Sequence, residues 1–131
     1  MKHIIIIFTI IFSCNTLKAE LQGQAKIDSL LKELPKMKED TNGVNLLLRL
    51  AYSKSIVKVE DGLDYCKKGL ELSIKINWQL GILKSYTYLS GYFSMKSDLV
   101  NGMKFSLKSL KLQKKLMIVI EYQIIWLFYQ C

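Results

Sequence analysis

A segment of eleven residues recurs forty positions further along the chain, and this repetition limits the fold more than any other feature. The first copy runs from Gly62 to Leu72 and the second from Gly102 to Leu112. Self-similarity at a fixed period is typical of repeat architectures, in which one supersecondary unit stacks on the next. Residues of the same class occupy matching positions: Gly62 with Gly102, Leu63 with Met103, Tyr65 with Phe105, Lys68 with Lys108, Leu70 with Leu110, and Leu72 with Leu112.

Apolar residues recur at helical spacing through most of the chain, so we expect an all-α fold. A short amphipathic helix is predicted at Lys26–Leu34. It is expected to end there because Pro35 disfavours helix in the residue before it. Asp40, Thr41 and Asn42 are all good N-cap residues for the helix that follows the connector. The remaining helices are predicted at Asn42–Ser55, Asp61–Ile76, Trp78–Met95 and Asp98–Lys115.

Glycines fall inside these predicted helices, where each costs about 0.5–1 kcal/mol relative to alanine. We interpret them as sites where neighbouring helices approach closely rather than as phosphate-binding loops. The glycines concerned are Gly62, Gly69, Gly81, Gly91 and Gly102.

The paired helices resemble tetratricopeptide repeats. The first helix of each pair carries leucine beside a small residue, at Leu50-Ala51 and Leu89-Ser90, and the second helix carries the repeated segment. The resemblance covers Asn42–Leu116 and implies a right-handed α-solenoid of antiparallel helix pairs, with a 40-residue period instead of the usual 34. It divides the chain into a capping helix and connector (20–41), two repeats (42–76 and 77–116) and an aberrant tail (117–131).

The resemblance also implies a function, which is a non-catalytic scaffold whose first helices line a groove for a protein or peptide partner. Arg49 and Lys84 suit a carboxylate, and Tyr52 and Tyr88 offer amphipathic contact area. The alternative is that the groove residues are ordinary exposed helix positions. Carried over one by one, they are Asn45, Arg49, Tyr52, Lys84, Thr87 and Tyr88.

Residues 1–19 are typical of a secretory signal, with Lys2 before an apolar run that is short for a membrane span. Three outcomes stay open: cleavage after Ala19, lipidation of Cys14, or an uncleaved anchor. Each predicts export to the periplasm or the outer membrane of a Gram-negative bacterium, with membrane contact only through the lipid or the leader.

The leader, Lys26–Leu31 and Asp40-Thr41 together resemble the exported N-terminal region of sensor and regulatory repeat proteins from Bacteroidetes-type bacteria. In many of those proteins the array precedes a histidine kinase or a DNA-binding domain. The alternative function is therefore a severed sensor domain without independent activity, because the chain contains no such output domain.

Composition argues against several other functions. The net charge is +8, but the lysines are dispersed and arginines are not clustered, so we expect no nucleic-acid partner. A stripe of lysines (Lys104, Lys108, Lys111 and Lys115) suggests a solvated helix face or contact with an acidic surface. His3, in the leader, is the only histidine, and Cys66 is expected to be a buried thiol. We therefore predict no enzyme activity, metal or cofactor.

The repeat pattern fails after Leu116. Residues 117–131 carry a single charge, at Glu121, where polar residues of a further repeat would begin. Two explanations stay open, namely a product of a shifted reading frame or a true apolar capping helix. With two repeats and an apolar end, we expect marginal stability and self-association through this tail.

Overall fold

The computed structural model describes the backbone of residues 23–130 and the side chains of residues 23–126. Within these residues the chain is helical and contains no strand, which confirms the all-α prediction. The predicted signal sequence, its cleavage at Ala19 and the lipidation of Cys14 lie outside the described residues.

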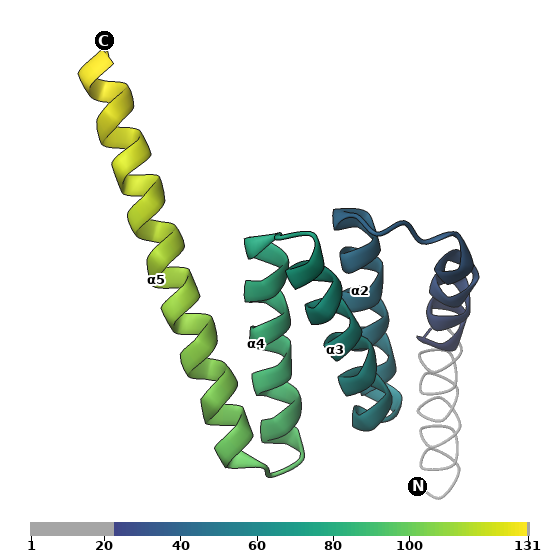
Figure 1. The fold of residues 1–131 in the computed structure, drawn as a ribbon. Helices are drawn as coiled ribbons and strands as arrows, with labels where there is room; N and C mark the ends of the chain where they lie inside the picture. Colours follow the sequence, from purple (N-terminus) through teal and green to yellow (C-terminus); the bar gives the residue numbers. More distant parts are fainter. Residues whose placement is uncertain (1–22, 131) are drawn as a thin grey trace, which may run out of the picture.

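Successive helices lie side by side in one antiparallel row (Figure 1). A helical segment at 23–33 continues into the 3₁₀ turn η1 (Leu34–Lys36), which contains Pro35. The row then continues through α2 (Thr41–Val57), α3 (Val59–Lys75), α4 (Gln79–Met95) and α5 (Leu99–Gln130). Each helix contacts the next one, and α2 also contacts α4.

Local sequence explains the helix ends. The Oδ1 atom of Asp40 accepts a hydrogen bond from the Gly43 N–H at 2.9 Å, as expected for an N-cap. Asp98 does the same for Asn101 at the start of α5, at 3.1 Å. Both α3 and α4 are followed by a residue in the left-handed conformation, Asn77 with φ 54° and Ser97 with φ 60°. This conformation lets the next N–H bond back into the last helical turn and satisfies a free carbonyl.

The core lies between α2, α3 and α4. Leucines dominate α2, and Leu47, Leu48 and Ala51 of α2 pack with Leu63 and Cys66 of α3. The same cluster includes Leu89 and Tyr92 of α4. The helical segment at 23–33 covers the other side of α2, with Ile27 and Leu30 almost completely buried.

Close approach at the glycines is confirmed except at Gly91. A Cβ atom on Gly62 would lie 2.6 Å from the Ala51 carbonyl oxygen and from the Ser55 Cβ atom. One on Gly102 would lie 2.9 Å from the Ser94 Oγ atom. Gly69 and Gly81 are also tightly packed, whereas nothing lies within 4 Å of Gly91, so that prediction is wrong. Gly91 is exposed because it lies on the solvent side of α4.

The last helix is longer than predicted. Its expected end at Lys115 is wrong, because α5 continues without interruption to Gln130. The segment 117–130 contains no proline or glycine, so no local signal ends the helix. Figure 1 shows α5 running far beyond the ends of the other helices, and the side chains at 117–126 are exposed. The tail therefore extends the last helix and does not fold over the α4–α5 hairpin.

None of the helices in the described part of the chain combines the length and the apolar character that a membrane crossing requires.

Candidate functional site

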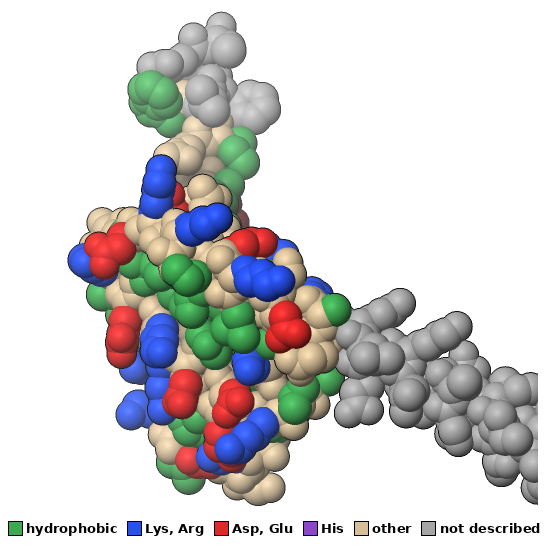
Figure 2. All heavy atoms as spheres, turned by 90° about the vertical axis from the view of Figure 1, so that its right-hand side faces the viewer, with side chains coloured by type: hydrophobic (Ala, Val, Ile, Leu, Met, Phe, Trp, Pro, Cys, Tyr) green, Lys and Arg blue, Asp and Glu red, His purple; other side chains and the backbone are tan. Residues whose placement is uncertain are grey.

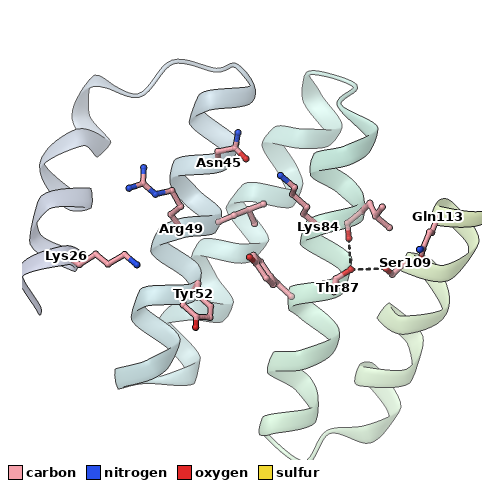
Figure 3. Close-up of a pocket in the computed structure, with 11 residues that line it drawn as sticks. Lys26, Asn45, Arg49, Tyr52, Lys84, Thr87, Ser109 and Gln113 are labelled. Atoms are coloured by element: carbon pink, nitrogen blue, oxygen red, sulfur yellow. Dashed lines mark hydrogen bonds between the residues drawn. The ribbon is translucent and has the colours of Figure 1, made fainter. Parts of the chain in front are cut away.

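A groove with a volume of about 580 Å³ crosses one face of the helix row (Figure 3). Its walls come from four places in the chain: the helical segment at 23–33, α2, α4 and α5. All six residues that the sequence predicts for the groove are brought together there. The lining residues are Lys26, Asn45, Leu48, Arg49, Tyr52, Leu83, Lys84, Thr87, Tyr88, Ser109 and Gln113.

Three residues of α2 line the groove because their spacing puts them on one face of the helix. Asn45, Arg49 and Tyr52 are separated by four and three positions, so they lie on one face of the helix. The residues around this stripe, including Leu46, Leu47 and Leu50, are buried against α3, α4 and the N-terminal helical segment. The groove stripe is thus the face of α2 that faces solvent.

Helix α4 holds its groove residues through polar contacts. Thr87 Oγ1 donates to the Leu83 carbonyl oxygen at 3.0 Å and lies 2.9 Å from Ser109 Oγ of α5. Lys84 Nζ lies 5.6 Å from the centre of the Trp78 ring, a distance suited to a cation–π contact. Thr87 therefore fixes one wall of the groove, while the cation of Lys84 stays at its surface.

The groove is positively charged. Lys26, Arg49 and Lys84 line it, and none of its lining residues is acidic. Within residues 23–126 none of these three cations forms an ion pair. Leucine side chains, Leu48 and Leu83, give the groove apolar surface between the charges. The groove thus offers cationic donors above an apolar floor.

Tyrosines add amphipathic surface to the groove. Tyr52 of α2 is 54% exposed and Tyr88 of α4 is 37% exposed. The Tyr88 ring lies 6.3 Å from the ring of Tyr92, which is buried behind it. A rigid ring with a polar end can contact both the apolar and the polar parts of a peptide at small entropic cost.

Sequence reasoning missed five lining residues for identifiable reasons. Lys26 belongs to the N-terminal helical segment, whose position beside α2 no repeat motif specifies. Leu48 and Leu83 were assigned to no groove because leucine usually indicates core. Ser109 and Gln113 lie on the second helix of their hairpin, whereas the family resemblance assigns the groove to first helices.

Reactive side chains are not gathered in the described part of the chain. Cys66 is fully buried, its Sγ donates to the Ser85 carbonyl oxygen at 3.5 Å, and burial raises the pKa of its thiol to about 12. This agrees with the expected buried thiol. No cluster of three or more potential metal ligands occurs among the described residues.

No family model, curated protein or solved structure matches the chain.

Proposed function

We propose that the chain is a docking module in which two tetratricopeptide-like hairpins, α2–α3 and α4–α5, hold a peptide segment of a partner protein. The basic groove is the observation that carries this proposal. Most of its lining residues come from the first helix of each hairpin, and the six expected from the family resemblance are all among them.

The pairing of helices supports the repeat assignment within this proposal. The glycine that opens each motif contacts a small residue of its own first helix: Gly62 lies against Ala51 and Ser55, and Gly102 lies near Ser94. Ser90, which corresponds to Ala51, donates from Oγ to the Gly102 carbonyl oxygen at 2.9 Å. In both hairpins the first and second helices thus contact each other at the same position of the motif. The contact between α2 and α4 places first helices side by side, as a shared groove requires.

The charge of the groove suggests the ligand class. An acidic peptide, or the carboxylate at a chain terminus, would find Arg49 on one wall and Lys84 on the other. Arginine suits a carboxylate because its planar guanidinium presents two parallel donors. The tyrosines and leucines of the groove would cover the apolar side chains of the same peptide, which gives affinity that charge alone does not supply.

A selection from a peptide library, followed by affinity measurement on the selected peptides, tests this proposal. We expect acidic peptides to be enriched. Charge reversal of both walls, with Arg49→Glu and Lys84→Glu, should weaken their binding at least about tenfold, equivalent to about 1.4 kcal/mol. The matched control is Lys67→Glu with Lys115→Glu, which changes net charge equally at exposed positions outside the groove.

Two outcomes would contradict the proposal. One is that selected peptides bind the wall variant as tightly as the original protein. The other is that the control variant weakens binding to the same extent, because the effect would then come from net charge and not from the groove.

The leader expected at residues 1–19 completes this proposal, since it would place the module outside the cytoplasm. Mass spectrometry of the exported protein would show whether the N-terminal residue follows Ala19 or is a lipidated Cys14.

A further inference from the structure

A second hollow, with a volume of about 350 Å³, lies between α4 and α5 and adjoins the groove. Three apolar side chains of α5 line it, and they are between 52% and 66% exposed. The hollow, called here the α5 seat, is defined by Met103, Ser106, Leu107 and Leu110. It shares three residues with the groove, namely Thr87, Ser109 and Gln113. Exposed apolar side chains around a hollow are typical of a surface on which another molecule docks.

The α5 seat repeats a surface that is occupied in the first hairpin. Forty residues before Met103 and Ser106 stand Leu63 and Cys66 of α3. Leu63 is 7% exposed and Cys66 is completely buried, whereas Met103 and Ser106 are both exposed. The same position of the repeat is therefore covered on α3 and open on α5.

Helix α4 is the element that covers this surface of α3. The Cys66 Sγ atom donates to the Ser85 carbonyl oxygen at 3.5 Å. A Cβ atom on Gly81 would lie 2.6 Å from the Ser73 Oγ atom, so the two helices approach closely there. Ser73 is the counterpart of Gln113, which lines the α5 seat. The first hairpin thus shows that this surface receives a helix.

The face that α4 buries states what such a helix must carry. Its four buried residues, Gly81, Ser85, Leu89 and Tyr92, are separated by four, four and three positions and lie on one face. Glycine and serine are small, so they let two helix backbones approach each other. Leucine and tyrosine supply the apolar area that is removed from water. A helix that fits the α5 seat should therefore present two small residues four positions apart, followed by leucine and an aromatic residue.

The hydroxyl groups of the α5 seat are already paired within the chain. Ser90 Oγ donates to the Gly102 carbonyl oxygen at 2.9 Å and lies 2.8 Å from Ser106 Oγ. Thr87 Oγ1 lies 2.9 Å from Ser109 Oγ. A hydroxyl that keeps its partner can be covered without the cost of an unsatisfied polar group. An apolar helix can thus cover these hydroxyls as α4 covers α3.

A second copy of this chain does not offer such a helix. The small and apolar face of its α4 is covered by its own core. Its tail, residues 117–126, contains no glycine, alanine or serine, so it cannot approach as α4 does. At its N-terminal end the segment 23–33 turns polar residues outward, including Asp28 and Lys32. Figure 2 shows lysine, arginine and acidic side chains interspersed over this end, around an apolar area.

We propose that the α5 seat binds an amphipathic helix of a partner protein, placed on α5 as α4 is placed on α3. The partner helix lays its small and apolar face over the seat, which is the helix-in-groove mode of recognition. Arg49 and Lys84, the groove residues expected to bind an acidic peptide, do not line the seat. The proposal therefore goes beyond the proposed function and does not depend on it.

Fluorescence anisotropy of a labelled synthetic peptide, titrated with the full chain, tests the proposal. The peptide has the sequence of residues 78–95, so it carries the face that α4 lays on α3. We expect saturable binding. Met103→Lys in the protein should weaken it at least about tenfold, because a cation then lies under the apolar face of the helix. The matched control is Met117→Lys, the same change at an exposed position outside the seat, which should leave the affinity unchanged.

A pair of peptide variants tests which face of the helix is bound. Leu89 is 1% exposed in the chain and Leu80 is 46% exposed. They are nine residues apart, which places them on opposite sides of a helix. Leu89→Lys in the peptide should weaken binding at least about tenfold, whereas Leu80→Lys should change it little.

Thiol labelling tests where the peptide binds. In the Ser106→Cys protein, saturating peptide should slow alkylation of the new thiol at least about tenfold, because Ser106 lines the seat. Its counterpart Cys66 is covered by α4 in the same way. Peptide mass spectrometry reports this position separately from the other cysteines.

Several results would overturn the proposal. Absence of saturable binding would do so, as would a thiol at position 106 that stays open when the peptide is bound. Full affinity in Met103→Lys would place the peptide elsewhere, for example on α3 in exchange for α4. Equal weakening by Met117→Lys would mean that the peptide binds the exposed tail. Circular dichroism of each protein variant would establish that the helices are retained.

Discussion

Helices α3 and α5 carry the same motif but have different surroundings. Helix α3 packs between α2 and α4, whereas among the described helices α5 packs against α4. The counterparts Leu63 and Met103 show the result, since Leu63 is 7% exposed and Met103 is 66% exposed. The motif therefore determines the helix and the face it turns to its own hairpin partner. Burial of the opposite face depends on the next element in the row.

The inner face of the motif behaves alike in both helices. Tyr65 of α3 and Phe105 of α5 both pack against the core, and the Phe105 ring stacks on Phe93 with centroids 5.5 Å apart. The Nζ atom of Lys68 lies 5.3 Å from the ring centroid of Tyr65, and the Nζ atom of Lys108 lies 5.4 Å from that of Phe105. These equivalent contacts make the two helices a matched pair for experiment.

The two helices should differ most in stability when the apolar residue that follows the first glycine of the motif, Leu63 or Met103, is truncated. Leu63→Ala should lower the free energy of unfolding by about 2–4 kcal/mol, because it leaves a cavity in the core. Met103→Ala should change it by less than about 0.5 kcal/mol, since the side chain is mostly in water. Urea unfolding at a concentration where the protein is monomeric measures both. Equal losses at the two positions would mean that α5 is covered in the monomer as α3 is.

A smaller difference is expected at the glycine that opens each motif. Gly62→Ala would push against the Ala51 carbonyl oxygen, which is backbone and cannot move aside, so we expect a loss of about 1–3 kcal/mol. At Gly102 the nearest atom is the Ser94 Oγ atom, which can rotate away. The gain in helix propensity, about 0.5–1 kcal/mol, should then roughly offset the contact. Thermal unfolding of both variants checks this, and comparable losses would show that the hairpins are packed equally tightly.

The smallest effect on stability is expected from a thiol comparison. Cys66 and Ser106 are counterparts forty residues apart, one buried and the other exposed. In Ser106→Cys the new thiol should react at neutral pH with an alkylating reagent as an open thiol does, while Cys66, with a pKa of about 12, stays protected until the protein unfolds. Peptide mass spectrometry separates these sites from Cys14 and Cys131. Rapid labelling of Cys66 in the folded protein would contradict its burial.

The sign of the pH effect at Cys66 follows from the same shift. Burial in the folded protein raises the pKa of the thiol from its ordinary value of 9.0 to about 12, so burial of the neutral thiol contributes stability below about pH 9. That contribution is lost as the pH rises from 9 toward 12, because the unfolded thiol ionises first.

Much of the fold was predictable because its signals are local. Helical spacing predicted three of the helices to within two residues at each end, and the stripe Asn45–Tyr52 was recognisable from the family resemblance. The end of α5 was not predictable in this way, because a helix without a stop signal ends where packing or solvation decides. Gly91 was misjudged for a related reason, since a glycine alone does not reveal which face of its helix meets a neighbour.

Lys58 alone joins α2 to α3, and this short link keeps the two helices of the hairpin close together. The close contact of Gly62 with Ala51 and Ser55 holds the same two helices together at the next turn. The groove, however, spans α2 and α4, which belong to different hairpins on either side of the turn at Asn77. A rotation at that turn would change the distance between Arg49 and Lys84. A ligand that bridges the two side chains would therefore link the two hairpins and restrict their relative motion.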